Sequence, residues 1–283
     1  MRLLWDNRFA VDICNALVTN VVQNATDIKM TKKSKLCIIN LQKQSTMENL
    51  LEQVKADVEA FLNQEQFFCN ECHLQMELAA YLRQSGNYSK VHLEYFVPGI
   101  EVQKQIDESL VPSKTTDKPQ NLYIDIVVEK NGEFLPIELK YKTAPLKKDI
   151  DRFGGVLQGV DVLKNHGARD LGAYDFWRDV NRIECLMKRF RNVKNGIALF
   201  LTNDQGYWNL PNLGTNPNYA NFSMKEKEGK HCKEKTWQGN TAMSASRLSF
   251  KVGKEYKLEW LPEIKDKQKW SNEKFRYCLL KIE

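Results

Sequence analysis

Two short segments separated by a turn contain the residues whose types and spacing best fit a chemical role. The segments are LYIDIVVEK and EFLPIELKYK, and Asn131-Gly132 lies between them. This dipeptide between alternating segments predicts a two-residue β-hairpin turn, because both central residues of such a turn need positive φ. Counting outward from the turn places Asp125 opposite Glu138. In that pair the strands exchange no hydrogen bonds, and the Cα atoms approach to about 4.5 Å.

Pro136 agrees with this register. The same count places it opposite Val127, also at a non-bonded pair, where its missing N–H costs no ladder hydrogen bond. Because side chains alternate along a strand, the polar residues of the hairpin should share one face. That face is expected to hold Tyr123, Asp125, Glu138 and Lys140, and the opposite, core-facing side is expected to hold Ile124, Ile126, Ile137 and Leu139.

Two opposed carboxylates in an apolar hairpin should repel each other and raise each other's pKa. A divalent cation would remove that repulsion, because hard ions prefer carboxylate oxygens and water. Lys140, two residues beyond Glu138, could hold the water or hydroxide that attacks a phosphorus atom. The alternative is an edge hairpin with solvated charges, in which Lys140 only pairs with one acid.

Asp125, a spacer and then Glu138-Leu139-Lys140 resemble the D…ExK signature of the PD-(D/E)XK nuclease superfamily. The resemblance covers about residues 47–203, and Ile124 stands where many members have proline. It implies a restriction-endonuclease-like α/β fold, a mixed sheet flanked by helices, here with additional C-terminal strands. It also implies that Asp125, Glu138 and the Leu139 carbonyl bind Mg²⁺ or Mn²⁺, and that Lys140 positions the nucleophile. The segments FFCNECHLQMELAAYL, PIELKYKT and YDFWRDVNRIE are similar to uncharacterised bacterial members of that superfamily.

Members of this superfamily often add an acidic residue from the first core helix. A helix capped by Asn70 and ending near Gly86 contains two candidates, Glu71 and Glu77. Glu71 shares the sheet-facing side of this helix, whereas Glu77 lies about 240° around the axis. We therefore expect Glu71 to be the catalytic acid, with Gln75 one turn later beside it. The alternative is that Glu71 only complements the helix N-terminus.

Three further residues are weaker candidates for contact with the metal's surroundings or with substrate. Arg178 and Arg182 lie three residues after Asp175 and Asp179 on an amphipathic helix, a spacing that also fits plain surface ion pairs. Gln158 is the kind of polar residue that related nucleases place near the metal.

The remaining pattern predicts one domain. A helix from Met47 begins the nuclease-like domain of 47–283, with a core over 47–203 and a C-terminal elaboration over 204–283. Residues 1–46 are expected to be an accessory extension or a mis-assigned start. Residues 101–120 are expected to form a loop, 146–165 and 174–190 helices, 196–203 a buried strand, and the tail two more strands.

The bulk composition favours an intracellular, cytoplasmic protein. The sequence has no apolar run long enough to cross a membrane, and its seven cysteines are irregularly spaced. Zinc binding by Cys69, Cys72, His231 and Cys232, or haem attachment at Cys69–His73, is a minor alternative to reduced, inert thiols. A net charge of +6 and a lysine-rich, Trp-containing stretch over 224–270 favour an anionic partner only mildly.

The leading functional expectation is Mg²⁺-dependent hydrolysis of nucleic acid, DNA in the first instance. A homodimer would be the simplest way to cut two strands. The main rival is a non-catalytic module that binds nucleic acid or protein on a nuclease-derived fold. A hydrolase for another phosphate ester is the third alternative.

Overall fold

The computed structural model describes residues 49–64, 68–99, 121–208, 218–226, 229–239, 247, 249–262 and 273–283. The chain divides into two units after Asn49, and the second unit is Leu50–Glu283. The expected extension over 1–46 and the expected loop over 101–120 lie outside the described residues. The described fold therefore belongs to the second unit.

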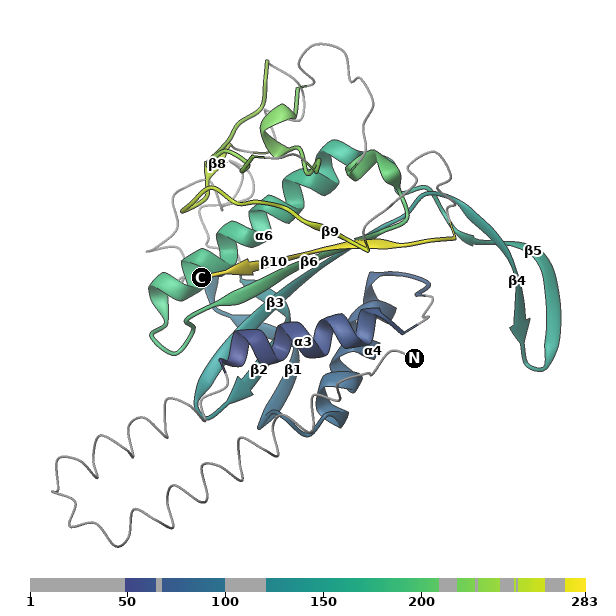
Figure 1. Ribbon diagram of the computed structural model, residues 1–283, viewed down its shortest axis with the longest axis horizontal. Coiled ribbons are helices and arrows are strands. Elements are labelled where there is room, and N and C mark those ends of the chain that lie inside the picture. The colour runs from purple at the N-terminus through teal and green to yellow at the C-terminus, as the bar shows by residue number, and fades with distance from the viewer. Residues whose placement is uncertain are drawn as a thin grey trace, which may run out of the picture. The chain divides into compact units, whose positions relative to one another are not determined.

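A six-stranded mixed sheet forms the centre of this unit, with the strand order β1-β2-β3-β6-β10-β9 (Figure 1). Its strands are β1 (Lys90–Val97), β2 (Leu122–Lys130), β3 (Glu133–Lys142), β6 (Gly196–Thr202), β10 (Arg276–Ile282) and β9 (Trp260–Leu261). Only β3 and β6 pair in parallel, and the other neighbours are antiparallel. The predicted mixed α/β architecture with added C-terminal strands is confirmed at this level.

Helices cover both faces of the sheet. Figure 1 shows α3 (Leu50–Leu62) and α4 (Glu71–Gln84) on one side and α6 (Arg169–Arg189) on the other. The first helix buries Leu51, Val54 and Val58 completely, as its 3–4 spacing predicts. The second begins after Asn70, whose side-chain oxygen accepts a hydrogen bond of 2.8 Å from His73 N. The predicted cap is confirmed.

The predicted hairpin register is also confirmed. The β2–β3 ladder runs from Lys130↔Glu133 to Ile126↔Ile137 and includes Val127↔Pro136. The two turn residues, Asn131 and Gly132, have φ of 53° and 77°. The ladder ends one pair before Asp125 and Glu138, so the two acids lie where the strands stop pairing.

The prediction of a helix over 146–165 is wrong. These residues form a separate two-stranded hairpin of β4 (Leu146–Arg152) and β5 (Gly155–Leu163), which projects from the sheet in Figure 1. A two-residue turn joins the strands, and a register shift between Lys148 and Ile150 interrupts their pairing. That bulge breaks the alternation by which a strand is recognised in a sequence.

The C-terminal part packs on the outer side of α6. It contains the 3₁₀ helices η2 (Gln205–Tyr207) and η3 (Ala220–Phe222) and the short strands β7 (Glu234–Lys235) and β8 (Phe250–Lys251). Buried Glu184 on α6 accepts hydrogen bonds from Gly253 N and from the Tyr256 hydroxyl, and it so joins α6 to the C-terminal part. In the described part of the chain, no helix has the length and apolar character needed to span a bilayer.

Candidate functional site

Asp125 lies where β2 changes the face to which its side chains point. Ile126 packs in the hydrophobic cluster that contains α3 and α4, whereas Ile124 packs in a cluster with the C-terminal half of α6. The expectation that these two isoleucines share a face is therefore wrong. The strands stop pairing here because the Asp125 carboxylate, through Oδ2, accepts a 2.6 Å hydrogen bond from Leu139 N.

The neighbouring strand β1 changes face at the same level. Leu93 packs on the α3–α4 side and Tyr95 on the α6 side, and Glu94 between them has φ 47°. As a result Tyr123 does not share a face with Glu138 and Lys140, contrary to expectation. It is 53% exposed, and its ring centroid lies 5.5 Å from that of Phe96.

Lys140 is held by a carboxylate from α6. Its Nζ lies 2.6 Å from Asp179 Oδ2 and donates a 2.9 Å hydrogen bond to the Leu139 carbonyl. Burial alone would lower the pKa of Lys140, but four surrounding carboxylates raise it above its ordinary value. They belong to Asp179, Glu71, Glu138 and Asp125. Lys140 is therefore a charged hydrogen-bond donor in this site.

Glu138 is a buried acid and is 2% exposed. Among the residues that the structure describes, none donates a hydrogen bond to its Oε1. Arg182 Nη1 lies 3.7 Å from this oxygen and 3.0 Å from Asp179 Oδ1. Burial, together with the charges of Asp179 and Asp125, raises the pKa of Glu138 well above its usual value despite Arg182. A positive charge at Oε1 would relieve this.

Helix α4 contributes the two residues expected from it. Glu71 Oε2 accepts a hydrogen bond of 2.7 Å from Tyr141 N, next to Lys140. Gln75 Nε2 donates to the Asp125 carbonyl at 2.8 Å and to Glu94 at 2.7 Å. Glu77, by contrast, is 55% exposed and pairs with His73, as its position around the helix indicates.

Besides Tyr123, two expected residues are not brought into this cluster. Gln158 is exposed on β5, in the projecting hairpin. This hairpin stands where a helix was predicted over 146–165. Arg178 is half-buried on α6, and its Nε makes no hydrogen bond within the described residues. The expected Asp179/Arg182 pair forms, but it is part of the site and not a surface ion pair.

The charges of the cluster do not balance. Four carboxyl groups surround two cationic side chains, Lys140 and Arg182, so the acids outnumber the cations by two. Burial raises the pKa of Asp125 to about 6, against the lowering effects of Lys140 and the Leu139 N–H. A divalent cation is the simplest species that would offset this excess.

The oxygen donors fit such a cation in type. Asp125, Glu138 Oε1 and the Leu139 carbonyl are hard ligands, although the carbonyl is hydrogen-bonded to Lys140 here. Across the described ranges, no three His, Cys, Asp or Glu side chains are grouped to hold a metal together. An ion here would thus have two carboxylates and one carbonyl, completed by water or phosphate, as is usual for Mg²⁺.

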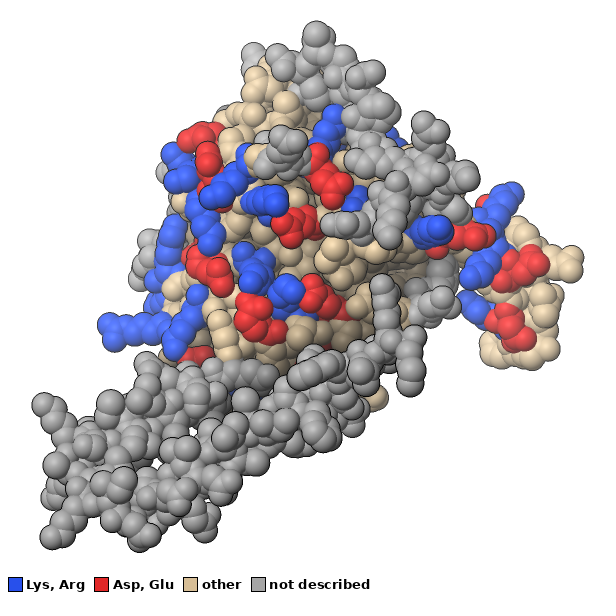
Figure 2. Space-filling model, in the orientation of Figure 1, with Lys and Arg blue, Asp and Glu red and all other residues tan. Residues whose placement is uncertain are grey.

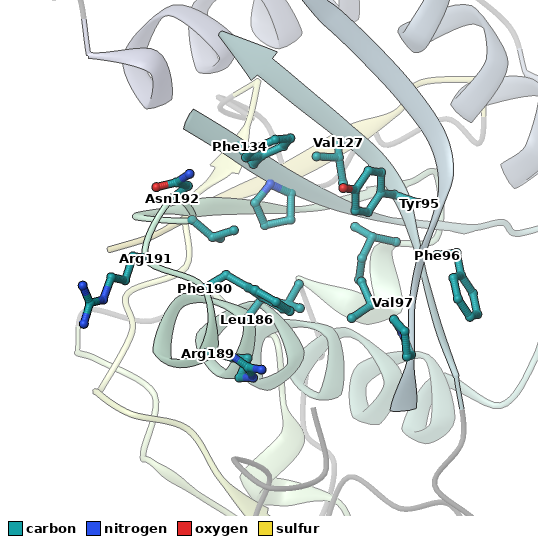
Figure 3. A pocket seen from close by; sticks show the side chains of 14 residues that line it. Tyr95, Phe96, Val97, Val127, Phe134, Leu186, Arg189, Phe190, Arg191 and Asn192 are labelled. Atoms are coloured by element: carbon teal, nitrogen blue, oxygen red, sulfur yellow. The ribbon is translucent and has the colours of Figure 1, made fainter. Parts of the chain in front are cut away.

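A cavity lined in part by Ile124, next to Asp125, is a different kind of space. It has a volume of about 590 Å³ and lies between the sheet and the end of α6. Figure 3 shows Phe134 and Val127 across from Leu186 and Phe190. None of the described residues that line it has a carboxylate, so it does not offer a cation the ligands that the cluster does.

Sequence reasoning missed the role of Asp179, which it treated only as the ion-pair partner of Arg182. One signal was available. Asp179 lies between Phe176, Val180 and Ile183 on the apolar side of its helix, and all four are buried. A buried charge on an apolar stripe needs a partner, which here is Lys140.

Comparisons with protein-family models, curated proteins and solved structures found no match. The functional argument therefore rests on the geometry and charge of this cluster.

Proposed function

We propose that the chain is a metal-dependent nuclease of the PD-(D/E)XK kind, with a restriction-endonuclease-like core, and that it hydrolyses phosphodiester bonds of DNA. One observation carries the proposal. Asp125, Glu138 and Lys140 lie together at the end of the hairpin ladder, with an excess of negative charge and an unsatisfied oxygen on Glu138.

Each residue has a role that follows from its contacts. Asp125 and Glu138, with the Leu139 carbonyl, would hold Mg²⁺ or Mn²⁺. When bound, such an ion would acidify a water molecule and offset charge on the phosphoryl oxygens. Lys140 stays protonated, so it orients the attacking oxygen as a donor and does not remove its proton. Asp179, 2.6 Å away, fixes the position of its ammonium group.

Glu71 and Arg182 complete the arrangement. Glu71 fixes the backbone of β3 through Tyr141 N and adds negative charge beside Lys140. Arg182 is 20% exposed and lies next to Glu138 and Asp179, so it can reach a phosphate that approaches the acids.

The experiment is cleavage of plasmid and single-stranded DNA with Mg²⁺ or Mn²⁺ by the wild type, Asp125→Ala and Lys140→Ala. We expect metal-dependent cutting that both variants lose, on the order of 10³-fold. Lys130→Ala, at the turn end of the same hairpin, is the matched control and should cut normally. Calorimetry with Mg²⁺ and Mn²⁺ measures the metal site independently of cutting.

A non-catalytic binding module is the second candidate, and one observation favours it. Lys140 already donates a hydrogen bond to the Leu139 carbonyl, and Arg182 already lies beside Glu138. Two of the proposed metal ligands therefore have cationic partners without a metal. A folded wild type that neither cuts DNA nor binds metal in calorimetry would contradict the nuclease proposal and leave this candidate.

A further inference from the structure

The β4–β5 hairpin contains exposed apolar side chains that the fold does not explain. Phe153 is fully exposed at 108%, Val156 is 67% exposed and Leu157 is 49% exposed. In Figure 2 the hairpin stands out from the body, with uncharged side chains on its outer side. These residues contribute nothing to the core, so packing does not account for them.

Local backbone preference does not account for Phe153 either. It has φ 56° and is followed by Gly154 with φ 76°, in the two-residue turn closed by Arg152↔Gly155. Such turns favour Asn, Asp or Gly, and a bulky aromatic residue at positive φ is an outlier. A strained, exposed Phe at the tip of a projection points to a contact outside the chain.

The two faces of this hairpin differ in charge. Directly paired residues of a sheet share a face, and side chains alternate along each strand. One face therefore contains Lys148, Ile150, Arg152, Leu157 and Val160, and the other contains Lys147, Asp149, Asp151, Val156 and Asp161. The first face combines cations with apolar residues and has no acid. On the second, Lys147 lies 3.7 Å from Asp161.

The hairpin is fixed to the catalytic end of the sheet. Leu146 and Leu163 at its base are buried in the same cluster as Tyr141, the residue after Lys140. Thr143 Oγ1 donates a 2.7 Å hydrogen bond to the Lys164 carbonyl, and His166 N donates a 2.9 Å bond to the Thr143 carbonyl. The seven residues of β4 span about 23 Å at 3.3 Å per residue.

We propose that the β4–β5 hairpin binds duplex DNA, with its Lys148/Arg152 face on the phosphate backbone and Phe153 against the bases. A two-stranded ribbon fits the major groove, and apolar wedges at base steps are a known way to grip and bend a duplex. The basic, acid-free face complements a polyanion better than it complements the same face of a second copy, which is also basic. This inference rests on the proposed function, because it deepens the substrate of that site to double-stranded DNA.

The test is fluorescence anisotropy of a labelled duplex with the full chain in EDTA, where metal-dependent cutting does not occur. Lys148→Gln and Arg152→Gln should each weaken binding about fivefold and lower the slope of log K against log salt by about one. Lys147→Gln removes the same charge from the opposite face and should change binding less than twofold. Phe153→Ala should weaken binding about tenfold, and Phe153→Tyr, which keeps a ring, should restore most of it.

The inference would be overturned by no duplex binding, by equal effects of Lys147→Gln and Lys148→Gln, by no effect of Phe153→Ala, or by binding of single strands only. Self-association that Phe153→Ala abolishes, with unchanged DNA binding, would identify the tip as a contact between copies and also overturn it. Cleavage separates this inference from the nuclease proposal. Duplex binding that depends on Phe153, without any cutting, supports the role of the hairpin and contradicts the nuclease proposal. Cutting that these variants leave unchanged supports the nuclease proposal and contradicts the role of the hairpin.

Discussion

At the scale of single residues, the proposed chemistry depends on how a buried carboxylate, Asp179, holds Lys140. Asp179 is 2% exposed and contacts Lys140 and Arg182, so it connects the two cations of the site. Because Lys140 stays charged, it acts as a hydrogen-bond donor, and its effect on a reaction depends on the direction of its N–H groups. A shift of about 1 Å at such a group can lower a rate on the order of 100-fold.

Asp179→Asn keeps the size of the side chain but removes its charge, so Lys140 loses the partner that fixes it. We expect the cleavage rate to fall on the order of 100-fold, with duplex binding unchanged within about twofold. Single-turnover kinetics and anisotropy measure the two quantities separately. Asp175→Asn, one turn earlier on the same helix, is the control and should cut normally. Equal losses in both variants would show that Asp179 has no special role.

Asp125 gives the metal-free protein a distinctive dependence on pH. Burial raises its pKa to about 6 in the folded state, above the ordinary value of 3.8. Between these values the folded state binds more protons than the unfolded state, so the free energy of unfolding falls as pH rises from about 4 to 6. The effect of this residue is at most about 3 kcal/mol. Urea unfolding in EDTA across this range measures it.

Two comparisons isolate the cause of that pH dependence. Asp125→Asn should reduce the fall in the free energy of unfolding between pH 4 and 6. Asp161→Asn, in the exposed hairpin, should leave that fall unchanged. Mg²⁺ should stabilise the wild type more at pH 7.5 than at pH 5, because protons and metal compete for the same oxygens. An Asp125→Asn variant whose stability depends on pH between 4 and 6 in EDTA as the wild type's does would contradict this account of the site.

The sequence predicted part of this cluster because the hairpin's register follows from local rules. Asn131-Gly132 sets the turn, and Pro136 agrees with the resulting count, so the proximity of Asp125 and Glu138 could be worked out. The pairing of Lys140 with Asp179 could not, because it depends on how α6 packs across the sheet. The position of Tyr123 was missed because nothing local indicates a change of face at Asp125.

At the scale of elements, the parallel pairing of β3 and β6 is close and leaves little room beneath α6. A Cβ at Gly196 would lie 2.5 Å from Ile183 Cγ2 and 2.9 Å from the Pro136 carbonyl oxygen. This glycine therefore sets how closely α6, β3 and β6 approach one another. The same contact helps to determine where α6 places Asp179.

Gly196→Ala should destabilise the fold by about 2 kcal/mol, because the added methyl meets backbone and a β-branched side chain. Urea unfolding followed by circular dichroism measures this. Gly229→Ala is the control, since a Cβ there meets nothing within 4 Å and the residue does not have positive φ. Its stability should match the wild type within about 0.5 kcal/mol. Equal stability of the two variants would mean that the interface can relax.

Elements differ in how well their sequences reveal them. The apolar periodicity of α3 and the continuous apolar run of β6 identify both, because each element buries a regular pattern. The β4–β5 hairpin buries almost nothing, and its bulge lies at Gly159, which has φ 61°. Without a buried face there is no period to detect, so a helix was predicted where a ribbon exists.

At the scale of the whole molecule, the site is assembled from both layers around the sheet. Glu71 comes from α4 on one side, Asp179 and Arg182 from α6 on the other, and the remaining three residues from the hairpin between them. No single element contains it. The site should therefore be lost whenever either layer is removed, even if the hairpin itself survives.

This dependence gives a prediction about truncation. Leu50–Glu283 is a compact unit, and α3 within it buries Leu51, Val54 and Val58. A chain that begins at Met47 should therefore unfold cooperatively, with a Tm within about 3 °C of the full chain, and bind Mg²⁺ as the full chain does. A chain that begins at Asn63 lacks α3 and should lose cooperative unfolding and metal binding together, because three fully buried side chains are removed from the cluster that supports α4. Calorimetry on both chains measures these quantities.

Each chain has an outcome that would contradict this prediction. If the chain from Met47 were unfolded, residues 1–46 would belong to the folded core. If the chain from Asn63 still bound metal, the site would not need the helical layer that contains α3.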